Sequence, residues 1–164
     1  MGEAGIIDTG TELIRGVILR KMIKSPQHTL TVKRLVETLV PQLSERVELR
    51  KEEPLTLDNS EPEPDVALVI RDSYDPLHCH PSTAVLVIEV AISSEALDRA
   101  KAAIYAAAKI PEYWLVLPGK KCVERFTVPQ GEGYLQVELI DFTGAIEFVV
   151  DRVPVVVDLA PLID

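Results

Sequence analysis

One carboxylate interrupts an apolar segment and constrains the fold more than any other residue in the chain. Residues 85–90 read VLVIEV, a pattern typical of a strand buried on both faces, and Glu89 lies inside it. Moving an ionised carboxylate out of water costs several kcal/mol unless a cation, hydrogen bonds or a shifted pKa compensates. The sequence therefore predicts that another part of the chain supplies a partner for Glu89.

The other segments predict a mixed sheet with two principal helices. Apolar and alternating runs bounded by turn residues indicate strands at 11–22 (two short strands around Arg15-Gly16), 46–52, 65–70, 85–90, 113–118, 122–128, 134–142 and 146–150. Helical spacing and end signals predict helices over 28–43, ending near Pro41, and from Ser93 or Ser94 to before Pro111. We interpret residues 153–164 as an apolar tail that packs on the body. The fold class is α/β or α+β, and residues 1–164 are predicted to form one domain.

The charge pattern argues against a protein that coats nucleic acid with a broad basic surface. The formal net charge is −9 and the sequence pI is about 4.9. A local basic groove stays open as an alternative, because four cations lie close together in sequence: Lys21, Lys24, Lys33 and Arg34. The start, MGEAGIIDTG, lacks the features of a signal peptide, and no apolar run is long enough for a bilayer. We expect a cytoplasmic protein that has no membrane partner.

The second predicted helix carries a polar stripe that includes a candidate partner for Glu89. Asp98, Lys101 and Tyr105 lie at positions i, i+3 and i+7, beside an apolar face made of Leu97, Ala100, Ile104 and Ala108. Because only a few residues separate this helix from the preceding strand, Lys101 could project toward Glu89. The alternative is an exposed ion pair between Asp98 and Lys101, which would contribute only a few tenths of a kcal/mol.

Asp65 and Glu89 form a candidate metal-binding pair. Each acid lies at an edge of an apolar strand, and neighbouring strands would bring the two carboxylates within ~5 Å of each other. A divalent cation would relieve the repulsion, and hard oxygen ligands suit Mg²⁺ or Mn²⁺. The alternative is a solvent-facing aspartate and a glutamate in a purely structural ion pair.

Three ordered motifs resemble a known family. The segments EPEPDVALVI, LVIEVAISSEALDRAK and YAAAKIPEYWLVLP are similar to the signature of a large bacterial family of putative restriction endonucleases, within the PD-(D/E)xK nuclease superfamily. TELIRGVILRKMIKSPQH also resembles the N-terminal hairpin and helix entry of that family, so the resemblance covers most of the chain. It implies a restriction-endonuclease-like core, in which a mixed central sheet is flanked by helices. It also implies hydrolysis of DNA phosphodiesters with Mg²⁺ or Mn²⁺.

The resemblance also implies roles for four residues. Asp65 matches the motif aspartate and Glu89 the second acid, both as metal ligands. The superfamily's lysine normally follows two residues later, where this chain has Ala91. Lys101 matches a lysine relocated to the following helix, where it would position or activate the attacking water. His28 matches a histidine often found at the first helix, which could contact phosphate or position water; the alternative is a helix-end hydrogen bond.

Three departures from the family pattern bear on activity. Val17 follows Gly16 where the family usually has a glutamate, which leaves Glu12 as the candidate substitute. The spacing between Glu89 and Lys101 is one residue shorter than usual. Lys109 stands where a glycine is usual before IPEYW. A catalytically impaired binding or assembly module is therefore the alternative function. Cleavage of both strands of a duplex would be easiest for a homodimer.

Overall fold

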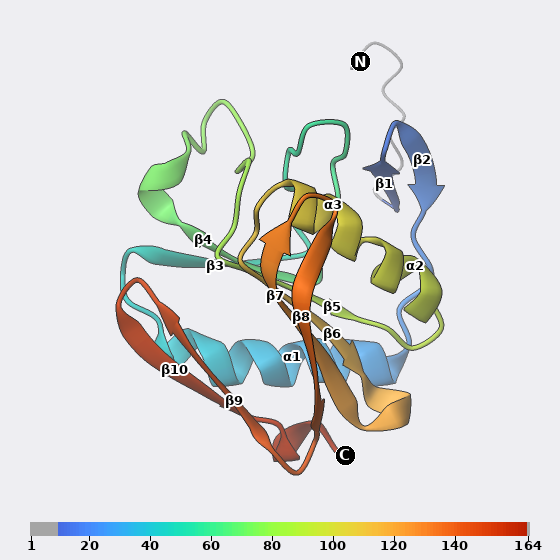
Figure 1. Cartoon of the computed structure of the whole chain (residues 1–164), viewed down its shortest axis with the longest axis vertical. Helices are drawn as coiled ribbons and strands as arrows, with labels where there is room; N and C mark the ends of the chain where they lie inside the picture. The colour runs from blue at the N-terminus through green and yellow to red at the C-terminus, as the bar shows by residue number, and fades with distance from the viewer. Residues whose placement is uncertain (1–9, 164) are drawn as a thin grey trace.

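The computed structural model describes residues 10–163, and a six-stranded mixed sheet forms their centre (Figure 1). In spatial order its strands are β3 (Val47–Lys51), β4 (Val66–Ile70), β5 (Leu86–Val90), β6 (Glu112–Leu117), β7 (Cys122–Gln130) and β8 (Gly133–Asp141). Only β5 and β6 run parallel; the other neighbouring pairs are antiparallel. The predicted mixed sheet with flanking helices is confirmed.

The parallel pair explains where the second predicted helix lies. Parallel neighbours need a crossover connection, and the chain makes it through α2 (Glu95–Ala100) and α3 (Ala102–Ala107). The sequence predicted one continuous helix, whereas the structure divides it by a turn at Lys101. Figure 1 shows these two short helices on one side of the sheet and α1 (Pro26–Leu39) on the other.

Helix α1 begins two residues before the predicted start. Ser25 caps it by accepting a hydrogen bond from the backbone N–H of His28 at 3.1 Å, and Pro26 supplies the φ angle favoured in a first helical turn. A 3₁₀ turn over Val40–Gln42 follows the helix and contains Pro41, close to the predicted end. The buried face of α1 packs on the sheet through Val32, Leu35 and Leu39.

The C-terminal segment packs on the body as predicted, but the sequence did not reveal the strand that it forms. In this segment β10 (Val153–Asp158) pairs antiparallel with β9 (Ala145–Val150) in a separate two-stranded ribbon. Val155 and Val157 are buried and their neighbours are exposed, so the segment alternates as a strand does. Two of its three exposed positions are Pro154 and Val156 rather than polar residues, and this hid the alternation in the sequence. The buried side of the ribbon extends the core on the α1 side.

The N-terminal hairpin forms as predicted. Its strands are β1 (Thr11–Ile14) and β2 (Val17–Arg20), and Arg15 and Gly16 join them. Both joining residues have positive φ angles, as the two central residues of a type I′ hairpin turn require. The hairpin docks on the 59–63 loop, where the Gly16 N–H donates to the Asn59 carbonyl at 2.9 Å. No helix in residues 10–163 combines the length and apolar character needed to cross a bilayer.

Lys109 ends α3 in left-handed backbone geometry, with a φ of 58°. A side chain is disfavoured in this conformation, and this side chain is exposed. We expect Lys109→Gly to raise the free energy of unfolding by about 0.5–1 kcal/mol, after subtraction of the extra freedom of glycine in the unfolded chain. Urea denaturation measures this change. Lys109→Ala is the control, because it removes the ammonium group but keeps Cβ; equal stabilisation by both variants would contradict the backbone explanation.

Candidate active site

Asp65 and Glu89 meet on neighbouring antiparallel strands. Val66 in β4 pairs with Ile88 in β5, and one further step of this register sets Asp65 opposite Glu89. Both side chains are buried, and both line a cavity of about 110 Å³. The cavity lies where the C-terminal end of β5, the start of α1, the N-terminal hairpin and α2 come together. The two predicted metal ligands therefore share one pocket.

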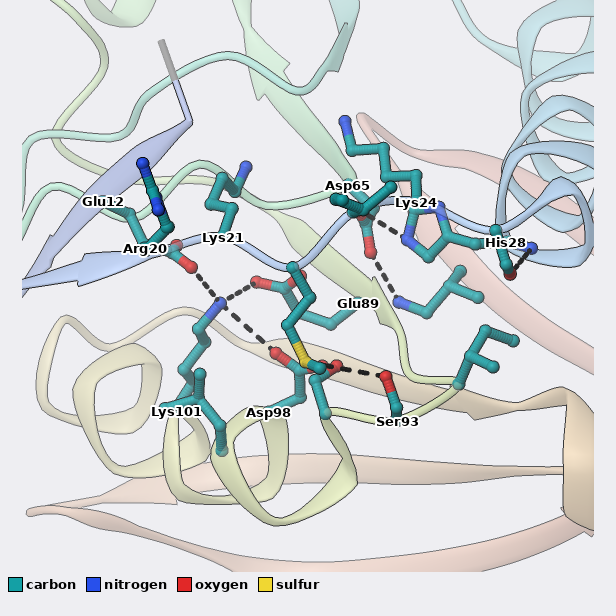
Figure 2. A pocket seen from close by; sticks show the side chains of 17 residues that line it. Glu12, Arg20, Lys21, Lys24, His28, Asp65, Glu89, Ser93, Asp98 and Lys101 are labelled. Atoms are coloured by element: carbon teal, nitrogen blue, oxygen red, sulfur yellow. Dashed lines mark hydrogen bonds and ion pairs between the residues drawn. The ribbon is translucent and has the colours of Figure 1, made fainter. Parts of the chain in front are cut away.

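Lys101 lies in the same pocket and contacts three carboxylates (Figure 2). Its Nζ atom is 2.8 Å from Glu12 Oε2, 3.3 Å from Glu89 Oε1 and 3.3 Å from Asp98 Oδ1. The lysine side chain is only 3% exposed, so the alternative of a surface ion pair with Asp98 is wrong. Burial opposes the charged form of Lys101, but the charges of Glu89, Glu12 and Asp98 outweigh it and raise its pKa. The ammonium group is the central cation of the site.

One carboxylate oxygen of Glu89 accepts hydrogen bonds from two side chains. The Tyr105 hydroxyl donates to Glu89 Oε1 at 2.8 Å, and the same oxygen accepts from Lys101. Burial raises the pKa of Glu89 well above its usual range, Lys101 opposes this shift, and the charges of Asp65, Asp98 and Glu12 add to it. Three carboxylates, those of Glu12, Glu89 and Asp98, therefore share the single ammonium group of Lys101.

Asp65 has a different environment from Glu89. Its Oδ2 atom accepts the backbone N–H of Val90 at 2.7 Å, and its Oδ1 atom lies 3.2 Å from Nε2 of His28. Burial alone would raise the pKa of Asp65, but the hydrogen bond and charge of His28, together with the Val90 N–H, lower it overall. His28 thus contacts an acid of the site, and its buried Nδ1 atom has no hydrogen-bond partner among the described residues.

Glu12 supplies an acid to the pocket, although Val17 stands where the family usually has a glutamate. Val17 is 56% exposed, whereas the Glu12 side chain on β1 is buried and reaches Lys101. Its other oxygen, Oε1, accepts the backbone N–H of Glu63 at 3.2 Å and so ties the hairpin to the 59–63 loop. The sequence named Glu12 only as a candidate substitute, and the contact with Lys101 shows which acid completes this side of the pocket.

Sequence reasoning missed the role of Asp98, because the polar stripe faces the interior. Leu97 on the predicted apolar face is 37% exposed, while Asp98 is buried. The Ser94 hydroxyl donates to Asp98 Oδ2, and the Tyr113 hydroxyl donates to the Asp98 carbonyl at 2.6 Å. Burial raises the pKa of Asp98, and Lys101 opposes this shift. The i, i+3, i+7 spacing of acid, lysine and tyrosine was the available signal.

Three cations at the end of β2 and on the segment that follows it line the same pocket. Arg20, Lys21 and Lys24 are labelled in Figure 2 at the upper side of the site. Lys21 also contacts Glu63 at 3.2 Å, and Lys24 contacts Glu52 at 2.7 Å. Of the four cations in the predicted basic stretch, Lys21 and Lys24 border the acidic pocket, whereas Lys33 and Arg34 are not among its lining residues.

The donor set fits a hard divalent cation. Asp65 and Glu89 offer carboxylate oxygens from opposed strand positions, and burial together with the neighbouring acids raises the pKa of Glu89. Within residues 10–163, no three His, Cys, Asp or Glu side chains are arranged as a ready-made metal centre. Mg²⁺ commonly binds one or two protein carboxylates and takes its other ligands from water and substrate phosphate. Two carboxylates in an accessible pocket match this mode.

Comparison with known proteins supports the nuclease fold. The chain is similar to a crystal structure of a putative nuclease belonging to DUF820 from Anabaena variabilis ATCC 29413, with a TM-score of 0.70 and 16% sequence identity over 93% of this chain and 89% of that one. This similarity confirms the predicted restriction-endonuclease-like core. The comparison with curated proteins gives no match. Residues 8–149 match the sequence model of Uma2, described as a putative restriction endonuclease. The chain therefore belongs to the Uma2 family of putative restriction endonucleases.

Proposed function

We propose that this protein is an endonuclease that hydrolyses DNA phosphodiester bonds with the help of Mg²⁺ or Mn²⁺. The observation that carries the proposal is the convergence of Asp65, Glu89 and Lys101 in one pocket of a nuclease fold. Burial raises the pKa of Glu89, Lys101 opposes this shift, and the charges of Asp65, Asp98 and Glu12 add to it. Carboxylates with strongly perturbed pKa values in a cleft are typical of functional sites.

Asp65 and Glu89 would hold the metal ion. When bound, the ion would supply Lewis-acid chemistry that activates water and stabilises charge on the phosphate. His28 positions Asp65 by contacting Oδ1, and the Val90 N–H fixes Oδ2. Tyr105 positions Glu89 in the same manner. These neighbours lock the orientation of both acids before a ligand arrives, which limits the reorganisation needed for catalysis.

Lys101 would orient the attacking water and stabilise the negative charge that develops on the phosphate. Its raised pKa keeps it cationic, so it acts through charge and as a hydrogen-bond donor, not as a base that removes a proton. The bordering cations Arg20, Lys21 and Lys24 would attract the phosphate backbone of DNA to the pocket. A homodimer would supply two such sites for the two strands, and the protein would act in the cytoplasm.

Calorimetric titration with Mg²⁺ and Mn²⁺ tests the metal site. We expect the wild type to bind either ion, Glu89→Gln to lose binding, and cleavage of a mixed DNA library to fall by at least about a hundredfold in that variant. Glu37→Gln is the matched control, because Glu37 lies on α1 with a side chain that is 62% exposed. Wild-type protein that neither binds metal nor cleaves DNA would contradict the proposal.

One observation favours the alternative of a binding or assembly module without catalysis. Each acid of the pocket already has a protein partner: Glu12, Glu89 and Asp98 contact Lys101, and Asp65 contacts His28. In such a module the four acids and Lys101 would only hold the hairpin, α2 and the sheet together. The two functions separate in the titration above, because the module predicts no specific metal binding by the wild type.

A further inference from the structure

Strand β8 is a long edge strand with an exposed apolar face. In the part of the chain that the structure describes, β8 pairs only with β7 and ends the sheet opposite β3. Leu135, Val137 and Leu139 alternate along one side of the strand and are 64%, 57% and 70% exposed. The backbone N–H and C=O groups on the outer side of such a strand are available to another strand.

The two edges of the sheet differ in how they resist such pairing. The β3 edge is five residues long and contains Arg50 and Lys51, and short charged edges discourage association. The β8 edge spans nine residues, GYLQVELID, without a lysine, an arginine or a proline. The side chains of Leu135, Val137 and Leu139 would contact water in an isolated chain. These properties indicate that β8 is covered by a partner strand.

We propose that β8 pairs antiparallel with β8 of a second copy of this chain, around a two-fold axis at Val137. In this register Leu135 of one copy lies opposite Leu139 of the other, and Val137 lies opposite its own copy. Opposed residues in an antiparallel pair project from the same face, so six aliphatic side chains form one continuous patch across the two-fold axis. The sheet would then continue through both copies.

The charges along β8 favour this occupant. In the same register Glu138 faces Gln136, and Asp141 faces Gly133, so no acid lies opposite another acid. A nucleic acid is a poor occupant, because the charged side chains of β8 are both acidic. The C-terminal segment of the chain is also excluded, because β10 already pairs with β9. A second copy satisfies the backbone groups, the apolar side chains and the charges together.

Analytical ultracentrifugation tests the interface. We expect the wild type to be a dimer and Val137→Lys to raise the dissociation constant at least about tenfold, because two ammonium groups would meet at the two-fold axis. Val149→Lys is the matched control: Val149 is a 68% exposed valine on β9 and should leave the dimer intact. Circular dichroism checks that both variants keep their fold. A monomeric wild type, or a dimer that persists unchanged in Val137→Lys, would overturn the proposal.

Cysteine cross-linking tests the register in a Cys79→Ser background, which removes the exposed native thiol. We expect Val137→Cys to form a disulfide with its own copy, Leu135→Cys to form none alone, and a mixture of Leu135→Cys with Leu139→Cys to cross-link. Self-linking of Leu135→Cys would overturn this register. The inference rests on the homodimer in the proposed function, but both tests run without metal or DNA. If the dimer tests fail, the metal titration still decides whether the protein is a nuclease. If the metal titration fails, the β8 interface can still be tested.

Discussion

Replacing Lys101 with methionine should lower the free energy of unfolding by about 3–5 kcal/mol, the cost of removing one partner from a buried ion cluster. Methionine keeps much of the side-chain volume but removes the cation that Glu12, Glu89 and Asp98 share. Those carboxylates would then be buried without a counter-charge, or would bind protons to become neutral. Chemical denaturation at neutral pH in the presence of EDTA measures the loss.

Arg99→Met is the matched control for this change. Arg99 lies on the same crossover, also contacts two glutamates, and has a side chain that is 42% exposed. Exposed ion pairs contribute little, so we expect a loss within about 1 kcal/mol. Adding Glu89→Gln to Lys101→Met should recover part of the stability, because it removes one of the uncompensated charges. Equal losses for the two single variants would show that burial of the cluster is not what makes Lys101 essential.

Replacing Glu89 with glutamine should raise the free energy of unfolding at neutral pH in EDTA, the opposite of the effect of Lys101→Met, while it abolishes cleavage. Folding raises the pKa of Glu89, so the unfolded chain releases this proton more readily than the folded one. Stability from this group is therefore greatest below the ordinary pKa of 4.5, and it is lost as the pH rises toward the folded-state pKa. Glutamine cannot ionise, so the variant should be more stable than the wild type at and above neutral pH in EDTA.

Denaturation of both proteins across a pH series in EDTA measures this difference. The two stability curves should approach each other in acid and separate as the pH rises, with the variant above the wild type. Some pH dependence should remain in the variant, because burial also raises the pKa of Asp98. Saturating Mg²⁺ should stabilise the wild type and leave the variant unchanged. A variant that is less stable than the wild type at every pH would show that Glu89 acts mainly as a structural hydrogen-bond acceptor.

The elements that the sequence predicted well are those with strong periodicity and clear end signals. Helix α1 and strands β4, β5 and β6 each bury a continuous apolar face, and proline or turn residues bound them. Strand β10 was missed because valine occupies both its buried and its exposed positions, so period-two contrast is absent. The turn at Lys101 was missed because the alanine-rich segment has high helix propensity throughout.

The candidate site could be predicted only in part, because some of its contacts join residues that are far apart in the sequence. A carboxylate inside an apolar strand is conspicuous, and the short connection to the next helix limited the search for its partner to Lys101. The inward orientation of Asp98 runs against ordinary amphipathic reasoning, which places the apolar stripe inside. The contact between Glu12 and Lys101 joins residues 89 positions apart, and no local pattern encodes such a distance.

Glu12 also ties completion of the pocket to the order in which the chain folds. The hairpin that carries it forms through contacts between near neighbours in sequence, but its attachment to Lys101 and to the 59–63 loop requires the rest of the molecule to be in place. Distant contacts form more slowly than local ones. We therefore expect the hairpin to close the pocket late in folding, and a fusion partner joined upstream of it should be given a spacer long enough to let this closure occur.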